Sequence, residues 1–196
     1  DNLESIIEVS DGIMVARGDL GVEIPTEEIP VAQKMMISKC NEVGKPVITA
    51  TQMLDSMMRN PRPTRAEVTD VANAIYDGTD AIMLSGETAA GKYPVKTIQT
   101  MSKICETTEA GINYKNKYQK SEFHINNTMD AISHSVCQMA IDIEAKAIVV
   151  CSLSGTTARM VSRFRPPVDI IGLSIEVKTW RALSLSWGII PALCQY

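Results

Sequence analysis

The stretch DGIMVARGD, residues 11–19, sets the pattern of the first half of the chain. Its apolar run Ile13–Ala16 recurs as Val47–Ala50 and Ala81–Leu84, so the runs start about 34 residues apart. A stretch with helical periodicity follows each run. Short strands that are apolar on both faces and alternate with helices are typical of a buried parallel sheet built from βα units. A helical solenoid has repeats of similar length, but the β-branched residues in these runs favour strands.

Local signals place the helices of this half. We expect one helix to be capped by Thr26 and to end near Glu42. The capping box Thr64–Glu67 predicts the start of a second helix, which ends before Gly78. A third helix is expected to begin near Pro94. Residues 3–7 have the periodicity of a helix tail, so we also expect a chain cut from a longer protein.

The repeat stops after Gly111, and the polar residues 115–127 have the composition of a linker. The remainder predicts a second α/β unit: a helix over 129–143, a strand over 147–151, a helix from near 154, a strand over 168–173, a helix over 177–187 and an apolar run over 189–193.

Three βα units are too few to close an eight-stranded barrel, which needs about 250 residues. Because the repeat ends on its carboxyl side, the three should be the last of eight. We therefore predict an α/β fold, in which residues 1–112 form units six to eight of a TIM-type (β/α)8 barrel and residues 113–196 form part of an α/β regulatory domain.

Composition narrows the class of protein. The chain has 196 residues, 45% of them hydrophobic and 21% charged, which fits a soluble globular protein. A net charge of −4 gives no electrostatic reason to expect nucleic acid or an anionic membrane as a partner. Five scattered cysteines without a C-x-x-C pair fit buried thiols in a reducing compartment, so we expect a cytoplasmic protein.

Polar residues follow each strand of the first half: Arg17-Gly18-Asp19, Thr51-Gln52 and Ser85-Gly86-Glu87-Thr88. The carboxyl ends of parallel strands meet at one edge. Carboxylate and hydroxyl oxygens there suit a hard cation, and glycine amides suit an anion. On spacing alone, these residues could equally be turns that end the strands.

A second pattern at the third strand is weaker. Gly86–Lys92 fits G-x-x-x-x-G-K, the beginning of a P-loop. The next residue is Tyr93, so the hydroxyl that would hold Mg²⁺ is missing, and Glu87 would put a negative charge inside the phosphate cradle.

Four stretches, taken together, resemble the pyruvate kinase family. They are residues 10–21, residues 44–53, residues 61–67 and residues 83–88, and they occur in order and at matching spacing. The resemblance is dense over residues 11–94 and looser beyond. It implies a glycolytic enzyme, a transferase of the kinase type that moves a phosphoryl group from phosphoenolpyruvate to ADP and gives pyruvate and ATP.

The resemblance also implies roles for individual residues. Asp19 would be one of two protein carboxylates on a catalytic Mg²⁺ or Mn²⁺. The backbone N–H groups of Gly18 and Asp19 would hold the substrate carboxylate, and Thr51 would contact the substrate near its enol carbon. Ser85 and Glu87 would order a water path for protonation of the enol.

Other parts of the family's active site have no match here, namely the Lys-Ile-Glu run, the K⁺ ligands, the substrate arginine and the lid domain. We therefore expect these 196 residues alone to be inactive. The family resemblance implies Mg²⁺ and K⁺ as cofactors, ATP binding, allosteric control and a homotetramer for the whole enzyme.

The second half carries one candidate site. Residues 151–158 place hydroxyls and a glycine between a strand and a helix, which suits a phosphate, although plain helix capping explains the same residues. This stretch resembles the family's loop for a sugar-phosphate effector. A free-standing phosphate-binding module without catalysis is the alternative function. The residues expected to bind the effector phosphate are Ser152, Ser154, Gly155, Thr156 and Thr157.

Overall fold

A computed structural model describes residues 2–195. It divides into two compact units. The first contains the residues up to Cys40 and Val47–Ile112, and the second contains Asn41–Pro46 and the residues from Asn113 onward. No helix among residues 2–195 has the length and apolar character needed to span a membrane.

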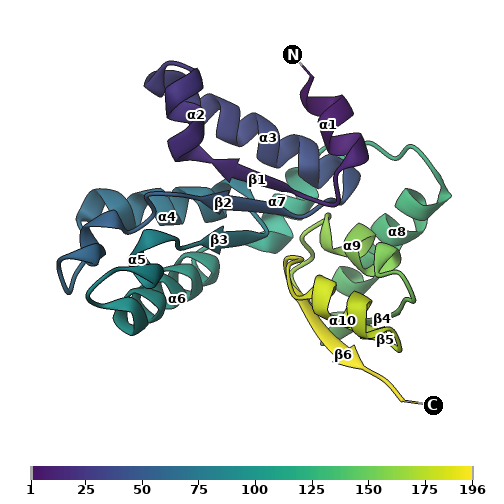
Figure 1. Ribbon diagram of the computed structural model, residues 1–196. Coiled ribbons are helices and arrows are strands. Elements are labelled where there is room, and N and C mark those ends of the chain that lie inside the picture. Colours follow the sequence, from purple (N-terminus) through teal and green to yellow (C-terminus); the bar gives the residue numbers. More distant parts are fainter. Residues whose placement is uncertain (1, 196) are drawn as a thin grey trace. The chain divides into compact units, whose positions relative to one another are not determined.

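The first unit is built on a parallel sheet of three strands, β1 (Ile13–Ala16), β2 (Val47–Ala50) and β3 (Ala81–Met83), in that order (Figure 1). The predicted βα units are confirmed. The register pairs the last residues of all three strands, so the residues that follow each strand emerge at one edge of the sheet.

Helices follow the strands as the sequence predicts, but with three differences, one of which is a short helix, Gly86–Ala89, that was not predicted. The helix expected to start at Thr26 begins at Ile29, because Thr26–Glu28 forms a 3₁₀ turn in front of it. A helix that was not predicted, Arg17–Glu23, follows β1 directly, and its two glycines hide the helical signal. The helices of this half are α1 (Leu3–Val9), α2 (Arg17–Glu23), α3 (Ile29–Val43), α4 (Arg65–Asp77), α5 (Gly86–Ala89) and α6 (Pro94–Ala110).

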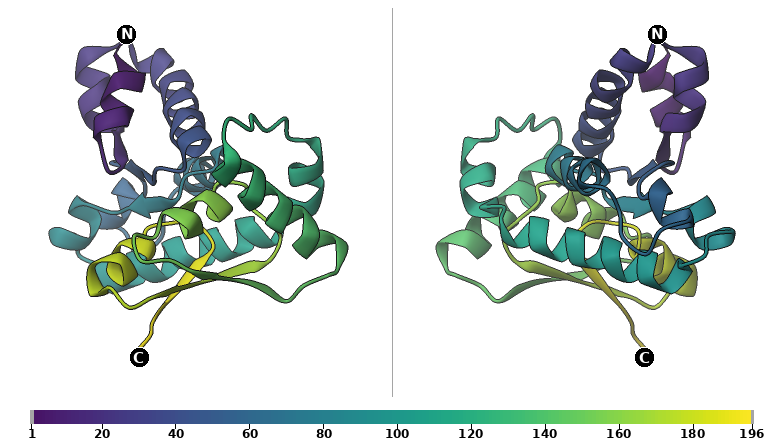
Figure 2. Two further views of the ribbon diagram at one scale, coloured as in Figure 1. Left: turned by 90° about the vertical axis from the view of Figure 1, so that its right-hand side faces the viewer. Right: turned by 90° about the vertical axis from the view of Figure 1, so that its left-hand side faces the viewer.

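The second unit contains another three-stranded parallel sheet, β4 (Ala147–Cys151), β5 (Asp169–Ser174) and β6 (Ile189–Leu193). Its helices are α7 (Tyr114–Lys120), α8 (Thr128–Asp142), α9 (Thr156–Ser162) and α10 (Val177–Leu183). Of these, α8, α9 and α10 pack against the strands (Figure 2).

The expected linker at residues 115–127 is partly wrong, because α7 occupies most of its first half. The reason is that two aromatic side chains anchor this helix, Tyr114 on the ring of Trp187 and Tyr118 in the core. Tyr118 is buried, its hydroxyl donates to the backbone oxygen of His134 at 3.0 Å, and its ring packs on Phe123. A polar helix anchored by two rings gives little apolar periodicity, so composition alone indicates a linker.

The strands of the second unit alternate in burial. Ile148, Val150 and Ile170 face the helices and are buried, whereas Val149 and Ile190 are more than half exposed. Alternation of this kind marks a sheet with one covered face. The packed face is therefore the core of this unit.

Candidate active site

The three strand ends of the first sheet bring two of the expected site residues into contact. The backbone N–H of Gly18, in the first turn of α2, donates to Oγ1 of Thr51 at 2.7 Å. The Thr51 hydroxyl lies 2.6 Å from the backbone oxygen of Ala50, to which it donates. Residues 33 positions apart thus share one hydrogen-bonded corner.

This corner is built on unusual backbone geometry. Thr51 and Gln52 have φ angles of +70° and +53°, in the left-handed region. A β-branched residue is rare there. Each such residue costs on the order of 1–3 kcal/mol, so neighbouring contacts must hold it in place. Sequence reasoning chose Thr51 for its hydroxyl and gave no sign of the strain.

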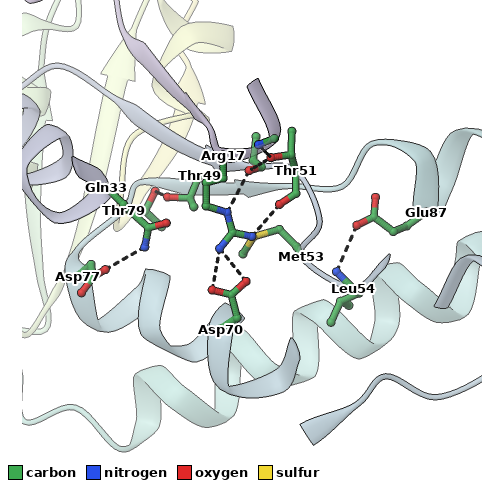
Figure 3. A network of polar contacts seen from close by, with 12 residues as sticks. Arg17, Gln33, Thr49, Thr51, Met53, Leu54, Asp70, Asp77, Thr79 and Glu87 are labelled. Atoms are coloured by element: carbon green, nitrogen blue, oxygen red, sulfur yellow. Dashed lines mark hydrogen bonds and ion pairs between the residues drawn. The ribbon is translucent and has the colours of Figure 1, made fainter. Parts of the chain in front are cut away.

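Arg17 supplies several of these contacts (Figure 3). Its Nη2 donates to the backbone oxygen of Thr51 at 2.7 Å, and its Nε donates to that of Ala50 at 3.3 Å. Its Nη1 lies 2.6 and 2.7 Å from the two carboxylate oxygens of Asp70, on α4. The sequence predicted Arg17 at this edge but no role for it, and it gave no sign of Asp70, because their partners lie 33 to 53 positions away.

Glu87 is buried, with 3% of its surface exposed. Its Oε1 accepts the N–H of Leu54 at 3.2 Å, and its Oε2 accepts the N–H of Ser85 at 2.9 Å. Figure 3 shows its contact with Leu54. The carboxylate therefore ties the segment after β2 to the segment after β3. Ser85 lies at the same strand end and is half-buried.

A second carboxylate holds the same segment further along. Glu67 accepts from the N–H of Ser56 at 2.7 Å and from its hydroxyl at 2.6 Å. It also closes the predicted capping box with Thr64, which is confirmed. Burial raises the pKa of Glu67, but the hydrogen bonds from Ser56 and Thr64 outweigh burial and hold the pKa below its ordinary value.

Asp19 is the one expected metal ligand. Its carboxylate is exposed, in the first turn of α2, where N–H groups have no intrahelical partner. Among residues 2–195, no three His, Cys, Asp or Glu side chains come together as a metal site. An exposed carboxylate fits Mg²⁺, which takes one or two protein carboxylates and fills its shell with water and substrate oxygens.

The P-loop interpretation fails on the hydrogen bonds of residues 90–92. The N–H groups of Ala90 and Gly91 donate to the backbone oxygen of Gly86, and that of Lys92 donates to Met58. A side chain at Gly91 would put its Cβ 2.3 Å from the backbone oxygen of Glu87, so glycine is required there for close packing. The amides that would cradle a phosphate are already used.

In the second unit, the predicted effector residues lie in the loop between β4 and α9 and in the first turn of α9. The hydroxyl oxygens of Ser154 and Thr156 are 3.0 Å apart. Arg159, on α9, donates to the backbone oxygen of Ser154 and to the Thr156 hydroxyl, both at 3.3 Å. Gly155 has a φ of +77°. Arg159 brings a positive charge to the loop that sequence reasoning missed.

A cavity of about 250 Å³ opens beside this loop, at the carboxyl ends of β4 and β5. Its lining is mostly apolar. Ser152, from the predicted effector set, forms part of its wall. The lining residues are Cys151, Ser152, Leu153, Leu173, Ser174, Ile175 and Cys194.

The first unit consists of parallel βα units whose carboxyl ends form a polar edge, as in barrel enzymes. A second parallel α/β unit follows it, so the chain is an α/β protein of two units. Two family models match it. The barrel-domain model of pyruvate kinase matches residues 1–98, and its alpha/beta-domain model matches residues 130–196. The chain belongs to the pyruvate kinase family.

Individual proteins agree with this assignment. The pyruvate kinase of Clostridium acetobutylicum is 57% identical over 194 residues, which is 98% of this chain and 41% of that protein. The pyruvate kinase of Sporosarcina psychrophila is 57% identical over 97% of this chain and 33% of its own length. A crystal structure of a pyruvate kinase from Cryptosporidium parvum superposes with a TM-score of 0.93 at 48% identity, over 98% of this chain and 40% of that one. The chain thus spans a third to two fifths of these relatives.

Proposed function

We propose that this chain supplies one wall of a pyruvate kinase active site, which transfers a phosphoryl group from phosphoenolpyruvate to ADP. The observation that carries the proposal is the corner where the Gly18 amide meets the Thr51 hydroxyl, next to the exposed carboxylate of Asp19. Phosphoryl transfer needs positioning and neutralisation of charge more than covalent chemistry. A corner of amide, hydroxyl and carboxylate provides groups of this kind.

Each group has a distinct part in this proposal. Asp19 would hold Mg²⁺ or Mn²⁺, which neutralises developing charge when bound. The Gly18 and Asp19 amides would bind the substrate carboxylate. For this, the Gly18 N–H must share or exchange its bond to Thr51. That exchange would leave the Thr51 hydroxyl free to turn toward the enol carbon.

Ser85 and Glu87 belong to this proposal in a different way. The family resemblance implies that they would order a water path for protonation of the enol. Glu87 supports the site by holding Leu54 and Ser85 in place. K⁺ would be bound by groups outside the matched stretches, in a homotetramer of the family's type.

The test is a coupled assay of pyruvate release from phosphoenolpyruvate and ADP, made on the natural polypeptide that carries this sequence. Turnover that requires Mg²⁺ supports the proposal. A Thr51→Ser variant, which keeps the hydroxyl, should retain more activity than Thr51→Val, which keeps the shape. Equal activity of the two variants would count against a role for the hydroxyl.

We propose a second role for the loop Ser152–Thr157, which is to bind the phosphate of a sugar-phosphate effector. Exposed hydroxyls, the Arg159 charge and the adjacent cavity support it. The loop's internal bond between Ser154 and Thr156 competes with a ligand. A module that binds phosphate without catalysis remains the rival function, and it predicts binding without turnover.

Titration with inorganic phosphate, followed by NMR shifts of the Ser152–Thr157 amides, tests this second role. Saturable shifts that Arg159→Gln weakens would support it. Shifts that are absent in the parent chain would show a loop that only caps its own helix, and shifts that are unchanged in Arg159→Gln would remove Arg159 from the site.

A further inference from the structure

We infer that Arg17 and Asp70 act as a positioning pair, which sets the orientation of Thr51 for catalysis without touching the substrate. This inference rests on the proposed function, because the proposed function is what assigns Thr51 a part in catalysis. The observation behind it is separate: one guanidinium spans two strand ends and one helix (Figure 3).

Arg17 holds the backbone on both sides of the bend at Thr51. Its Nη2 and Nε donate to the backbone oxygens of Thr51 and Ala50, on either side of the bend where φ becomes positive. A guanidinium presents its donors in one rigid plane. Two carbonyls bound to one plane cannot rotate independently, so the left-handed conformation of Thr51 is stabilised from outside the strand.

Asp70 holds the guanidinium of Arg17 in turn. Its carboxylate accepts from Nη1 of Arg17 through both oxygens. The Arg17 side chain is only 12% exposed, whereas that of Asp70 is 37% exposed. Asp70 therefore anchors a mostly buried cation and fixes the direction in which the guanidinium plane points. It also links the bend to α4.

The hydrogen bonds of Arg17 leave it no direct role in binding the substrate. All three guanidinium nitrogens already have acceptors: Asp70 on Nη1, Thr51 on Nη2 and Ala50 on Nε. A side chain engaged in this way is not available to bind a substrate phosphate. Arg17 therefore acts through Thr51: it holds the backbone from which the Thr51 hydroxyl projects.

The experiment is a double-mutant cycle in the natural polypeptide, with kcat and KM measured for phosphoenolpyruvate. Arg17→Met is expected to lower kcat by about a hundredfold, the cost of misplacing a reacting group by about 1 Å, while KM changes little. In a Thr51→Ala background, the same change should have almost no further effect on kcat. Asp70→Asn, which keeps the shape of the side chain, should also lower kcat, but by a smaller factor than Arg17→Met.

The matched control is Lys34→Met, which breaks the ion pair with Asp77 in the same unit and leaves the bend untouched. It should change neither kcat nor KM. Multiplicative losses in the double variant would overturn the inference, since they would show that Arg17 acts independently of Thr51. If Arg17→Met does not fold, the cycle is run with Asp70→Asn and is read in the same way.

Hydrogen exchange separates this inference from the proposed function. The Gly18 amide is protected through its bond to Thr51, so Asp70→Asn and Arg17→Met should speed its exchange, whereas Lys34→Met should not. This holds whether or not the protein turns over phosphoenolpyruvate. Unchanged exchange at Gly18 in both variants would overturn the positioning role, and an inactive parent protein with faster exchange would overturn only the proposed function.

Discussion

At the scale of residues, Glu87 joins two strand ends through buried hydrogen bonds. In Glu87→Gln, one acceptor oxygen becomes an NH₂ group that faces a backbone N–H. A buried donor left without an acceptor costs about 1–3 kcal/mol. We expect the free energy of unfolding in urea to fall by about that amount. Glu106→Gln is the control, because the Glu106 carboxylate is exposed and accepts from Ser102; an equal loss in both variants would contradict the bridging role.

The residue scale is also where sequence reasoning falls short. Asp19 and Thr51 could be chosen because metal and substrate chemistry require their functional groups. The roles of Arg17 and Asp70 could not be predicted, because nothing near an arginine in the sequence indicates partners 33 and 53 residues away. The left-handed φ of Thr51 is equally hidden, because propensity favours other residues in that conformation.

At the scale of elements, the capping box of α4 carries a pH prediction. The pKa of Glu67 in the folded chain lies below its ordinary value of 4.5. A carboxyl group whose pKa is lower in the folded state than in the unfolded state stabilises the fold at any pH above the unfolded-state pKa. This stabilisation is lost as the pH falls through the folded-state pKa. We therefore expect Glu67→Gln to be less stable than the parent chain at pH 7 and the difference to shrink below about pH 4.5.

Urea denaturation from pH 7 to pH 3 measures this difference. A difference in the free energy of unfolding that stays constant from pH 7 to pH 3 would contradict the lowered pKa of Glu67. Thr64→Ala removes the other half of the box and should cost about 1 kcal/mol. Thr64→Ser, which keeps the hydroxyl, is the matched control.

Elements were predictable where the signal is local and unpredictable where it is tertiary. The strands at residues 13–16, 47–50, 147–151 and 189–193 have the predicted bounds, because continuous apolar runs define them. The helix α2 was missed because glycines interrupt it, and α7 was missed because it is polar apart from its anchors Tyr114 and Tyr118. Both depend on contacts that a window of sequence does not contain.

At the scale of the whole molecule, we expect a polypeptide of these 196 residues alone to show no pyruvate kinase turnover. Among residues 2–195, Asp19 offers the metal a single carboxylate, without a cluster of further ligands. Removing one electrostatic group from an active site commonly costs about 10²–10³ in rate. Calorimetry should likewise show Mg²⁺ binding no tighter than about millimolar. Turnover well above background, or a micromolar dissociation constant, would refute this expectation.

The central claim is that the edge after β1 belongs to the active site, and one pair of variants tests it. Asp19→Asn and Asp11→Asn each remove one exposed carboxylate, Asp19 beyond the carboxyl end of β1 and Asp11 before its amino end. We predict that, in the natural polypeptide, Asp19→Asn lowers kcat/KM for phosphoenolpyruvate by at least about a hundredfold, while Asp11→Asn leaves it unchanged. Equal activity of the two variants would contradict the account.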